Sequence, residues 1–226
     1  MTLPPKEGEG MPRLDVHLPS STSHIVCIGD SITNGDTGLG FHASRPWPQS
    51  VGRLLNAKVT ACGHDGASTV DYRSCPEYGQ AKAAVPSADI IVFGLGTNDV
   101  DLEHARDRDS VAKVIPRLES LVRECIGDST RNPEIAVLSV LQFATEEPIF
   151  RERFELAELE QLNQGVDLLN AEYRCMCRRN HWHFIDYASN FNQRREYYGN
   201  SIHPNQRGYD FIARILAPRL AGLLGA

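Results

Sequence analysis

Four short polar segments hold the residues of this chain whose types and spacing favour chemistry. Ser31 ends a Gly-Asp-Ser segment that follows an apolar run, and His203 stands near the carboxyl end. A serine hydroxyl next to an imidazole base can attack an acyl carbon if hydrogen-bond donors face the oxyanion that forms. Gly66, through its backbone N–H, and Asn98, through its side-chain amide, are candidates for such donors. A glycine suits this role because, without Cβ, its N–H can approach a substrate oxygen closely.

The elements that must position these residues are visible as two alternating patterns. From residue 24 onward, short apolar runs alternate with segments whose apolar residues recur at steps of three and four. The runs span residues 25–28, 58–62, 89–95, 135–141 and 183–185, and the clearest helical segments span 111–125, 159–176 and 209–220. Strands without a polar side must be covered on both faces, and alternation with helices implies parallel crossovers. We therefore predict a three-layer α/β/α sandwich with a five-stranded parallel sheet.

The polar segments fall at the ends of the predicted strands. Ser31 follows the first strand, Gly66 the second and Asn98 the third, while His203 comes after the fifth strand and just before the last helix. In open α/β sheets, ligands bind beyond the carboxyl ends of the strands. We therefore expect the four residues to meet at one edge of the sheet.

Composition and charge narrow the class of protein. The 226 residues carry a net charge of −6 and a pI near 5.7, which argues against nucleic-acid and membrane-surface partners. The proline- and serine-rich residues 1–23 are predicted to form a flexible arm, and residues 24–226 a single domain. We see no membrane-spanning run and no signal-peptide pattern, so the expectation is a cytoplasmic protein.

The ordered segments resemble those of the SGNH or GDSL-type esterases and lipases. Gly-Asp-Ser at 29–31, Gly66, Gly-Thr-Asn-Asp at 96–99 and His-Pro at 203–204 occur in the order of that family. The resemblance implies a flavodoxin-like fold, Ser31 as nucleophile, His203 as base, and an oxyanion hole formed by Ser31, Gly66 and Asn98. It also implies a small-molecule acyl ester as substrate and no metal. No organic cofactor is expected, because the four segments already supply a nucleophile, a base and oxyanion donors.

Asn200 departs from the family pattern, in which an aspartate usually stands three residues before the histidine. An asparagine can accept a hydrogen bond from the imidazole, but it brings no charge to stabilise imidazolium, and its amide can favour the wrong tautomer. We therefore predict a slow esterase that Asn200→Asp accelerates by orders of magnitude. Asp186 and Glu196 are acids that could replace the missing aspartate, although neither stands at the expected spacing.

Residues beside the proposed oxyanion donors are candidates for substrate contacts. His64 and Asp65 precede Gly66, and Val100 follows the third segment. For His64 and Asp65, solvated loop positions are an equally good interpretation. Asp30 and Asp99 resemble family positions that hold the loops of the site by hydrogen bonds, so we assign them structural roles.

Histidines and cysteines outside these segments are interpreted as structural. His181 and His183 stand two apart in what looks like one strand, as metal ligands would, but no third ligand is in view. We expect them to be edge or core histidines. Most of the six cysteines are expected to be small buried hydrophobes, because no pair shows zinc-ligand spacing and the chain is long for a disulfide framework.

Three functions remain open from the sequence: an ester hydrolase, an acyltransferase of the same family, and a binding or scaffold protein that kept the fold but lost turnover. Asn200 motivates the last of these. Labelling of Ser31 by a serine-reactive fluorophosphonate separates the enzymes from the binding protein. The oligomeric state, the acyl group and the alcohol of the substrate are not predicted.

Overall fold

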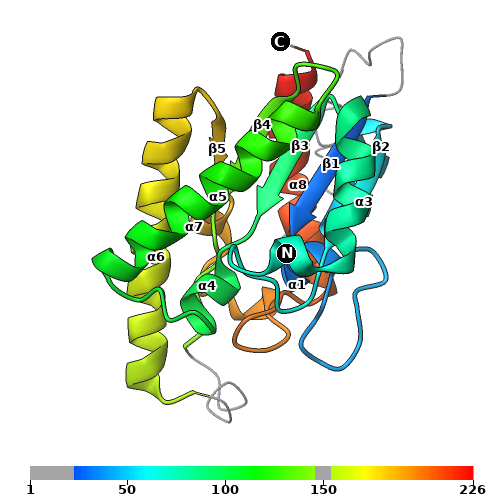
Figure 1. The fold of residues 1–226 in the computed structure, drawn as a ribbon. Helices are drawn as coiled ribbons and strands as arrows, with labels where there is room; N and C mark the ends of the chain where they lie inside the picture. Colours follow the sequence, from blue (N-terminus) through cyan, green and yellow to red (C-terminus); the bar gives the residue numbers. More distant parts are fainter. Residues whose placement is uncertain (1–22, 146–153, 226) are drawn as a thin grey trace, which may run out of the picture.

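A parallel sheet forms the middle layer of the computed structural model, which describes residues 23–145 and 154–225. Nearly all of the predicted arm at 1–23 lies outside the described residues. Within them the sheet has five strands in the order β2-β1-β3-β4-β5, and all neighbouring pairs are parallel (Figure 1). The strands are β1 (His24–Gly29), β2 (Lys58–Gly63), β3 (Ile90–Gly94), β4 (Glu134–Leu138) and β5 (His183–Ile185).

Helices cover both faces of the sheet. In Figure 1, α3, α5 and α6 lie in front of the sheet and α8 lies behind it. The longer helices are α2 (Trp47–Leu55), α3 (Pro76–Ala84), α5 (Arg108–Asp128), α6 (Leu156–Asn180) and α8 (Gln206–Leu224). Shorter ones are α1 (Ser31–Asn34), α4 (Thr97–Asp101) and α7 (Ala188–Phe191), with 3₁₀ turns η1 (Tyr72–Ser74), η2 (Val85–Ser87) and η4 (Arg195–Tyr197). The predicted three-layer α/β/α fold is confirmed.

Alternate residues of each central strand enter different cores. In β3, Ile91 and Phe93 pack with α5 and α6, whereas Ile90 and Val92 pack with α2 and α8. All four side chains are fully buried. This two-sided burial is why β3 is an uninterrupted apolar run, since no position of the strand faces water.

The strand order places a crevice at the carboxyl edge of β1 and β3. The chain moves from β1 outward to β2, then returns to β3 on the other side of β1 and continues to β5. The connection after β1 runs toward β2 and the connection after β3 runs toward β4, in opposite directions. Their divergence leaves a crevice outside the carboxyl ends of β1 and β3. The segments that follow β1, β2 and β3 therefore converge where ligands bind in this class of fold.

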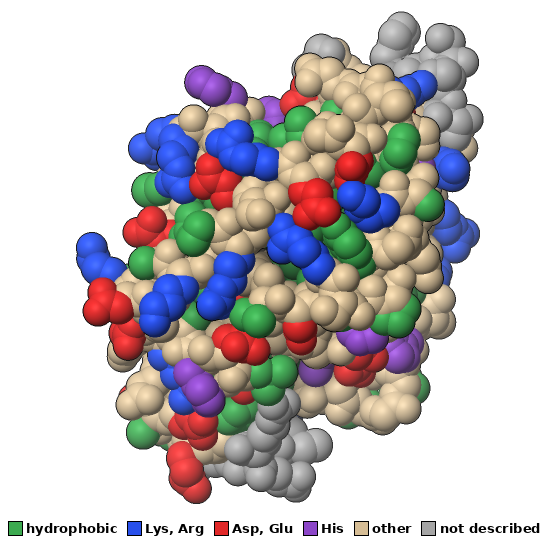
Figure 2. Space-filling model, viewed as in Figure 1, with side chains coloured by type: hydrophobic (Ala, Val, Ile, Leu, Met, Phe, Trp, Pro, Cys, Tyr) green, Lys and Arg blue, Asp and Glu red, His purple; other side chains and the backbone are tan. Residues whose placement is uncertain are grey.

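Acidic and basic side chains are interspersed on the face formed by α3, α5 and α6 (Figure 2). Glu119 of α5 bonds Arg123 one turn later and Arg179 of α6, each at 2.9 Å, and Glu124 bonds Arg73 at 2.9 Å. The pairs of Glu119 with Arg179 and of Glu124 with Arg73 join neighbouring elements, and the arginines are matched by carboxylates rather than forming a basic patch. Among the described residues, no helix combines the length and the apolar character needed to cross a membrane.

The structure corrects one expectation for the histidines and agrees with the expectation that most of the cysteines are buried. His181 is not on a strand with His183: it caps the end of α6 with φ of 58°, and His183 bonds Glu134 at 2.8 Å. All six cysteines are free, and four of them are buried. Cys175 is exposed on α6, since its position falls on the helix face that points to water.

Candidate active site

Ser31 is held at the turn from β1 into α1. The carboxylate of Asp30 caps this helix by accepting the N–H of Ile32 at 3.0 Å. Ser31 is the first residue of α1, so its N–H has no acceptor within the helix and can donate to a ligand. The residue is buried, with only 4% of its surface exposed.

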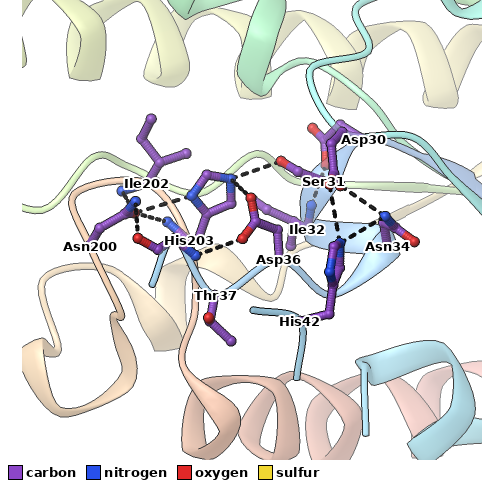
Figure 3. Close-up of polar contacts among 12 residues, drawn as sticks. Asp30, Ser31, Ile32, Asn34, Asp36, Thr37, His42, Asn200, Ile202 and His203 are labelled. Atoms are coloured by element: carbon purple, nitrogen blue, oxygen red, sulfur yellow. Dashed lines mark hydrogen bonds and ion pairs between the residues drawn. The ribbon is translucent and has the colours of Figure 1, made fainter. Parts of the chain in front are cut away.

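His203 reaches Ser31 from the far end of the chain. Its Nε2 lies 2.9 Å from the hydroxyl oxygen of Ser31, a contact that spans 172 residues (Figure 3). The loop that carries His203 is closed by two backbone contacts: the N–H of Gly199 donates to the carbonyl of His203 at 2.8 Å, and Tyr198 bridges Pro204. The predicted nucleophile and base are thus brought into hydrogen-bond contact.

Asn200 faces the other nitrogen of the ring through its oxygen. Its Oδ1 accepts the backbone N–H of Ile202 at 2.8 Å and that of His203 at 2.7 Å, and lies 3.2 Å from His203 Nδ1. The backbone groups are obligate donors, so the side chain cannot flip without breaking both bonds. Nδ1 must therefore carry the proton, which leaves Nε2 as the acceptor of the Ser31 hydroxyl. The concern about a wrong tautomer does not apply to this geometry.

Gly66 and Asn98 lie beside Ser31 around one pocket. Gly66 has φ of +80°, a conformation that favours glycine, and a Cβ added there would meet no atom within 4 Å. The backbone conformation, not crowding, is what calls for glycine. Asn98 donates one amide hydrogen to the carbonyl of Ala67 at 2.9 Å, and its second hydrogen can donate to a ligand.

The pocket between these residues is small. Its volume is about 180 Å³. Besides Ser31, His203, Gly66 and Asn98, it is lined by Asp36, Asp65, Asp101, Leu102 and Ile202. The lining therefore combines carboxylates with two apolar side chains.

The three residues predicted to contact substrate occupy different environments. Asp65 lines the pocket and bonds Asn34 at 2.9 Å. His64 instead faces Glu77, with Nδ1 2.6 Å from the carboxylate. The expectation for Val100 is corrected: its side chain is fully buried in the core packed by α5 and α6, because α4 turns that side of the helix away from the pocket.

Neither acid considered as a replacement for the missing aspartate is at the ring. Asp186 bonds Arg174 at 2.9 Å and accepts the N–H of Ser189 at 3.1 Å and its hydroxyl at 2.8 Å. Glu196 pairs with Arg194 at 3.4 Å. Both carboxylates are thus engaged with arginines elsewhere.

Sequence reasoning missed two residues of the loop after α1. Asp36 Oδ2 lies 3.6 Å from His203 Nε2, on the same side of the ring as Ser31 (Figure 3). Gly38 has φ of +69°, and a Cβ there would lie 1.9 Å from Asn200 Nδ2, so only glycine lets the loop pass this close. The available signal was local: Asp36 follows Ser31 closely, in a segment that contains several glycines.

Two buried carboxylates hold the loops of the site. Asp99 accepts the N–H of Thr69 at 3.0 Å, which ties the segment after β2 to α4, and burial raises its pKa. Burial also raises the pKa of Asp30 to about 7, against the opposing effect of its hydrogen bonds from Thr97 and Ile32. Both residues make the loop contacts that the sequence led us to expect.

The raised pKa of Asp30 predicts a pH-dependent loss of stability. A carboxyl whose pKa is higher in the folded state than in the unfolded state stabilises the fold. This contribution is complete at pH values below the unfolded-state pKa of about 4 and is lost as the pH rises through the folded-state pKa of about 7. Asparagine can also cap a helix but does not ionise. We expect Asp30→Asn to raise the thermal midpoint relative to the native chain more at about pH 8 than at about pH 4, as measured by calorimetry.

Asp107 provides the control for this prediction. It caps α5 by accepting the N–H of Ser110 at 2.8 Å, but it is exposed, and its hydrogen bonds with Ser110 lower its pKa. Asp107→Asn should therefore lower stability slightly at high pH, the opposite sign. Parallel stability curves for the native chain and Asp30→Asn across this pH range would contradict the assignment.

The fold and the geometry of the site together indicate the class of protein. A serine at a β1 turn, bonded to a histidine from the last loop at the carboxyl edge of a parallel sheet, is the arrangement of an α/β serine hydrolase. The GDSL-like lipase/acylhydrolase family model matches residues 27–211. The chain therefore belongs to that family of esterase-type hydrolases.

Solved structures similar to this one carry the same fold. A carbohydrate acetylesterase family member from Sinorhizobium meliloti is 26% identical, with a TM-score of 0.67 over 91% of this chain and 100% of that one. An aryl esterase from M. smegmatis is 19% identical, with a TM-score of 0.68 over 89% and 100%. A GDSL-like lipase from Bacteroides thetaiotaomicron is 18% identical, with a TM-score of 0.62 over 88% of each chain. No curated protein matches the sequence.

Proposed function

We propose that this protein hydrolyses carboxylic acyl esters through a Ser31 acyl-enzyme, with His203 as the base. The observation that carries the proposal is the 2.9 Å contact between the Ser31 hydroxyl and His203 Nε2 at the wall of a pocket that Gly66 and Asn98 also line. A nucleophile, a base and donors on one small pocket are the parts that acyl transfer needs.

Each part has a defined step. The Ser31 proton moves to His203 Nε2 as the oxygen attacks the carbonyl carbon, and the N–H of Ser31, the N–H of Gly66 and the Asn98 amide donate to the oxyanion. When the tetrahedral adduct collapses, Nε2–H returns the proton to the departing alcohol. Water then attacks the acyl-enzyme while His203 Nε2 takes its proton, and collapse of the second adduct returns that proton to Ser31 Oγ and releases the carboxylic acid.

The pocket favours a short acyl group. A volume of about 180 Å³ is below that of pockets for drug-sized ligands, which start near about 300 Å³. Leu102 and Ile202 give the acyl group an apolar contact. The similar structure described as a carbohydrate acetylesterase family member supports acetyl esters as the first substrates to test.

The test combines labelling with a substrate series. A fluorophosphonate should label the native chain at Ser31, located by peptide mass spectrometry, and nitrophenyl esters should be cleaved fastest at acetyl or propionyl length. Added alcohols distinguish hydrolysis from acyl transfer, since a transferase yields the new ester in place of the acid. Absence of both labelling and turnover would reject the proposal in favour of the binding-protein alternative.

Asn200→Asp tests how much the missing charge costs. In serine proteases, a change of the triad aspartate to asparagine lowers kcat by about 10⁴-fold because the wrong tautomer forms. Here the Asn200 oxygen already selects the productive tautomer, so what is lacking is a negative charge on the Nδ1 side of the ring. An aspartate would also lose the 3.4 Å bond from Nδ2 to the carbonyl of Gly38. We expect a gain in kcat of about 10- to 100-fold, with a similar KM and the acid limb of the pH profile moved to higher pH.

The control for Asn200→Asp is Asn200→Ala, which removes the acceptor of Nδ1–H altogether and should lower kcat. A native chain that is already fast and is unaffected by Asn200→Asp would contradict this prediction and show that a negative charge at Nδ1 does not limit the rate. Steady-state kinetics with the best nitrophenyl ester between about pH 5 and 9 provide the measurement.

A further inference from the structure

Asp36 places a carboxylate on the side of His203 opposite Asn200. Its Oδ2 is 3.6 Å from Nε2, the nitrogen that receives the Ser31 proton, and its Oδ1 accepts the N–H of Gly38 at 2.8 Å. Neither side chain is well exposed, at 26% for Asp36 and 12% for His203. A carboxylate fixed by one oxygen and turned to the base by the other is placed to act on that base.

We propose that Asp36 is the positioning residue that supplies the negative charge which Asn200 does not, and that it stabilises the imidazolium of His203 from the Nε2 side. This inference rests on the proposed function, because the charge matters only when His203 accepts a proton. A neutral ring gains little from Asp36. When the Oγ–H bond breaks and the Nε2–H bond forms, the new cation lies next to the Asp36 carboxylate. The interaction therefore favours the transition state over the ground state.

The loop that carries Asp36 is built to hold it there. Asp36 bridges His42 as an antiparallel pair, the N–H of Ala43 donates to the carbonyl of Gly35 at 2.7 Å, and the Tyr209 hydroxyl of α8 donates to the carbonyl of Asp36 at 2.5 Å. These contacts come from both ends of the loop and from α8. The Asp36 backbone is therefore held in place, and its carboxylate is less mobile than that of a surface side chain.

The other ionisable groups around the pocket are placed differently. Asp65, after β2, bonds Asn34 at 2.9 Å and His42 at 3.1 Å, so its charge is directed to that pair. Asp101 of α4 also lines the pocket and is nearly buried. Within the described residues, no lysine or arginine lines the pocket to offset these charges. Both aspartates add to a negative surrounding, and Asp36 forms an ion-pair contact with His203 at 3.6 Å.

The first test is Asp36→Asn, which keeps an oxygen for the N–H of Gly38 but removes the charge. We expect kcat to fall about 10- to 100-fold with KM little changed, and the apparent pKa of His203, followed by NMR, to fall by about one unit or more. The His203 signal is assigned by its loss in His203→Gln. Asp109→Asn, which removes the same charge from an exposed site on α5, should leave both quantities unchanged.

Moving the negative charge from one side of the His203 ring to the other distinguishes an electrostatic role of Asp36 from a structural one. In the double variant Asp36→Asn/Asn200→Asp the anion moves from Nε2 to Nδ1, so kcat and the His203 titration should return at least to native values. A structural role for Asp36 would not be rescued in this way. Asp36→Ser, whose hydroxyl can still accept the N–H of Gly38, gives a second variant if Asp36→Asn folds poorly by circular dichroism.

The NMR titration also separates failure of this inference from failure of the proposed function, since it needs no turnover. An unchanged His203 titration in both Asp36 variants would overturn the role of Asp36 even in an active esterase. If the apparent pKa of His203 falls in the Asp36 variants while the native chain cleaves no ester and reacts with no fluorophosphonate, the ion pair is supported and the ester chemistry is rejected. An Asp36→Asn loss that Asn200→Asp does not rescue would also overturn the proposal.

Discussion

Ser31→Ala should abolish ester turnover, with kcat lower by about 10⁶-fold, the loss seen when the nucleophile of a serine hydrolase is removed. The alanine offers no oxygen to form the acyl-enzyme, and His203 Nε2 loses its 2.9 Å partner. Fluorophosphonate labelling should vanish with it. The thermal midpoint should change little, because the Ser31 hydroxyl is bonded to a partly exposed ring rather than to the core.

Two further variants make this result specific. Ser189→Ala removes an exposed serine hydroxyl from α7 and should leave both turnover and labelling intact. The double variant Ser31→Ala/His203→Ala should be no slower than Ser31→Ala, because residues that act as one unit lose their effect together. Steady-state kinetics and intact-protein mass spectrometry measure both. Native-like turnover in Ser31→Ala would place the nucleophile elsewhere and reject the proposed mechanism.

Asn98→Ala carries the second large effect, a fall in kcat of about 10²- to 10³-fold with little change in KM. A neutral amide at the pocket wall can donate to the oxyanion, whose charge exists only in the transition state, so its removal should spare substrate binding. Asn98 also donates to the carbonyl of Ala67 at 2.9 Å, and its loss leaves that group unpaired. Some decrease in the thermal midpoint is therefore expected alongside the kinetic effect.

Asn163→Ala separates the two consequences of removing Asn98. Asn163 is an amide that bonds the backbone N–H and carbonyl of Phe143 at 2.7 and 2.9 Å, and it does not line the pocket. Its loss should lower the thermal midpoint with kcat retained at temperatures where the chain is folded. If Asn98→Ala raised KM and left kcat unaffected, Asn98 would be a residue of ground-state binding instead of an oxyanion donor.

The sequence by itself determined the layers of the fold and which segments meet at the carboxyl edge of the sheet. Burial on two faces forces apolar strands such as 90–93, and a helix packed on one side shows its period directly in residues such as Val111, Val114 and Leu118. The polar segments after β1, β2 and β3 could be placed at one edge because parallel strands share their carboxyl ends. These are local patterns, readable because each residue's burial follows from its place in a repeating element.

Only the tertiary structure decided how the side chains of the site face one another. The orientation of Asn200 depends on two backbone N–H groups of its own loop, and the contact of Asp36 with His203 joins segments from opposite ends of the chain. Val100 was misplaced for the same reason, since the side of a short helix that meets the core is chosen by α5 and α6 and not by its own five residues. Irregular loops have no repeating burial pattern, so the direction of each side chain is set by distant contacts that the order of residues does not display.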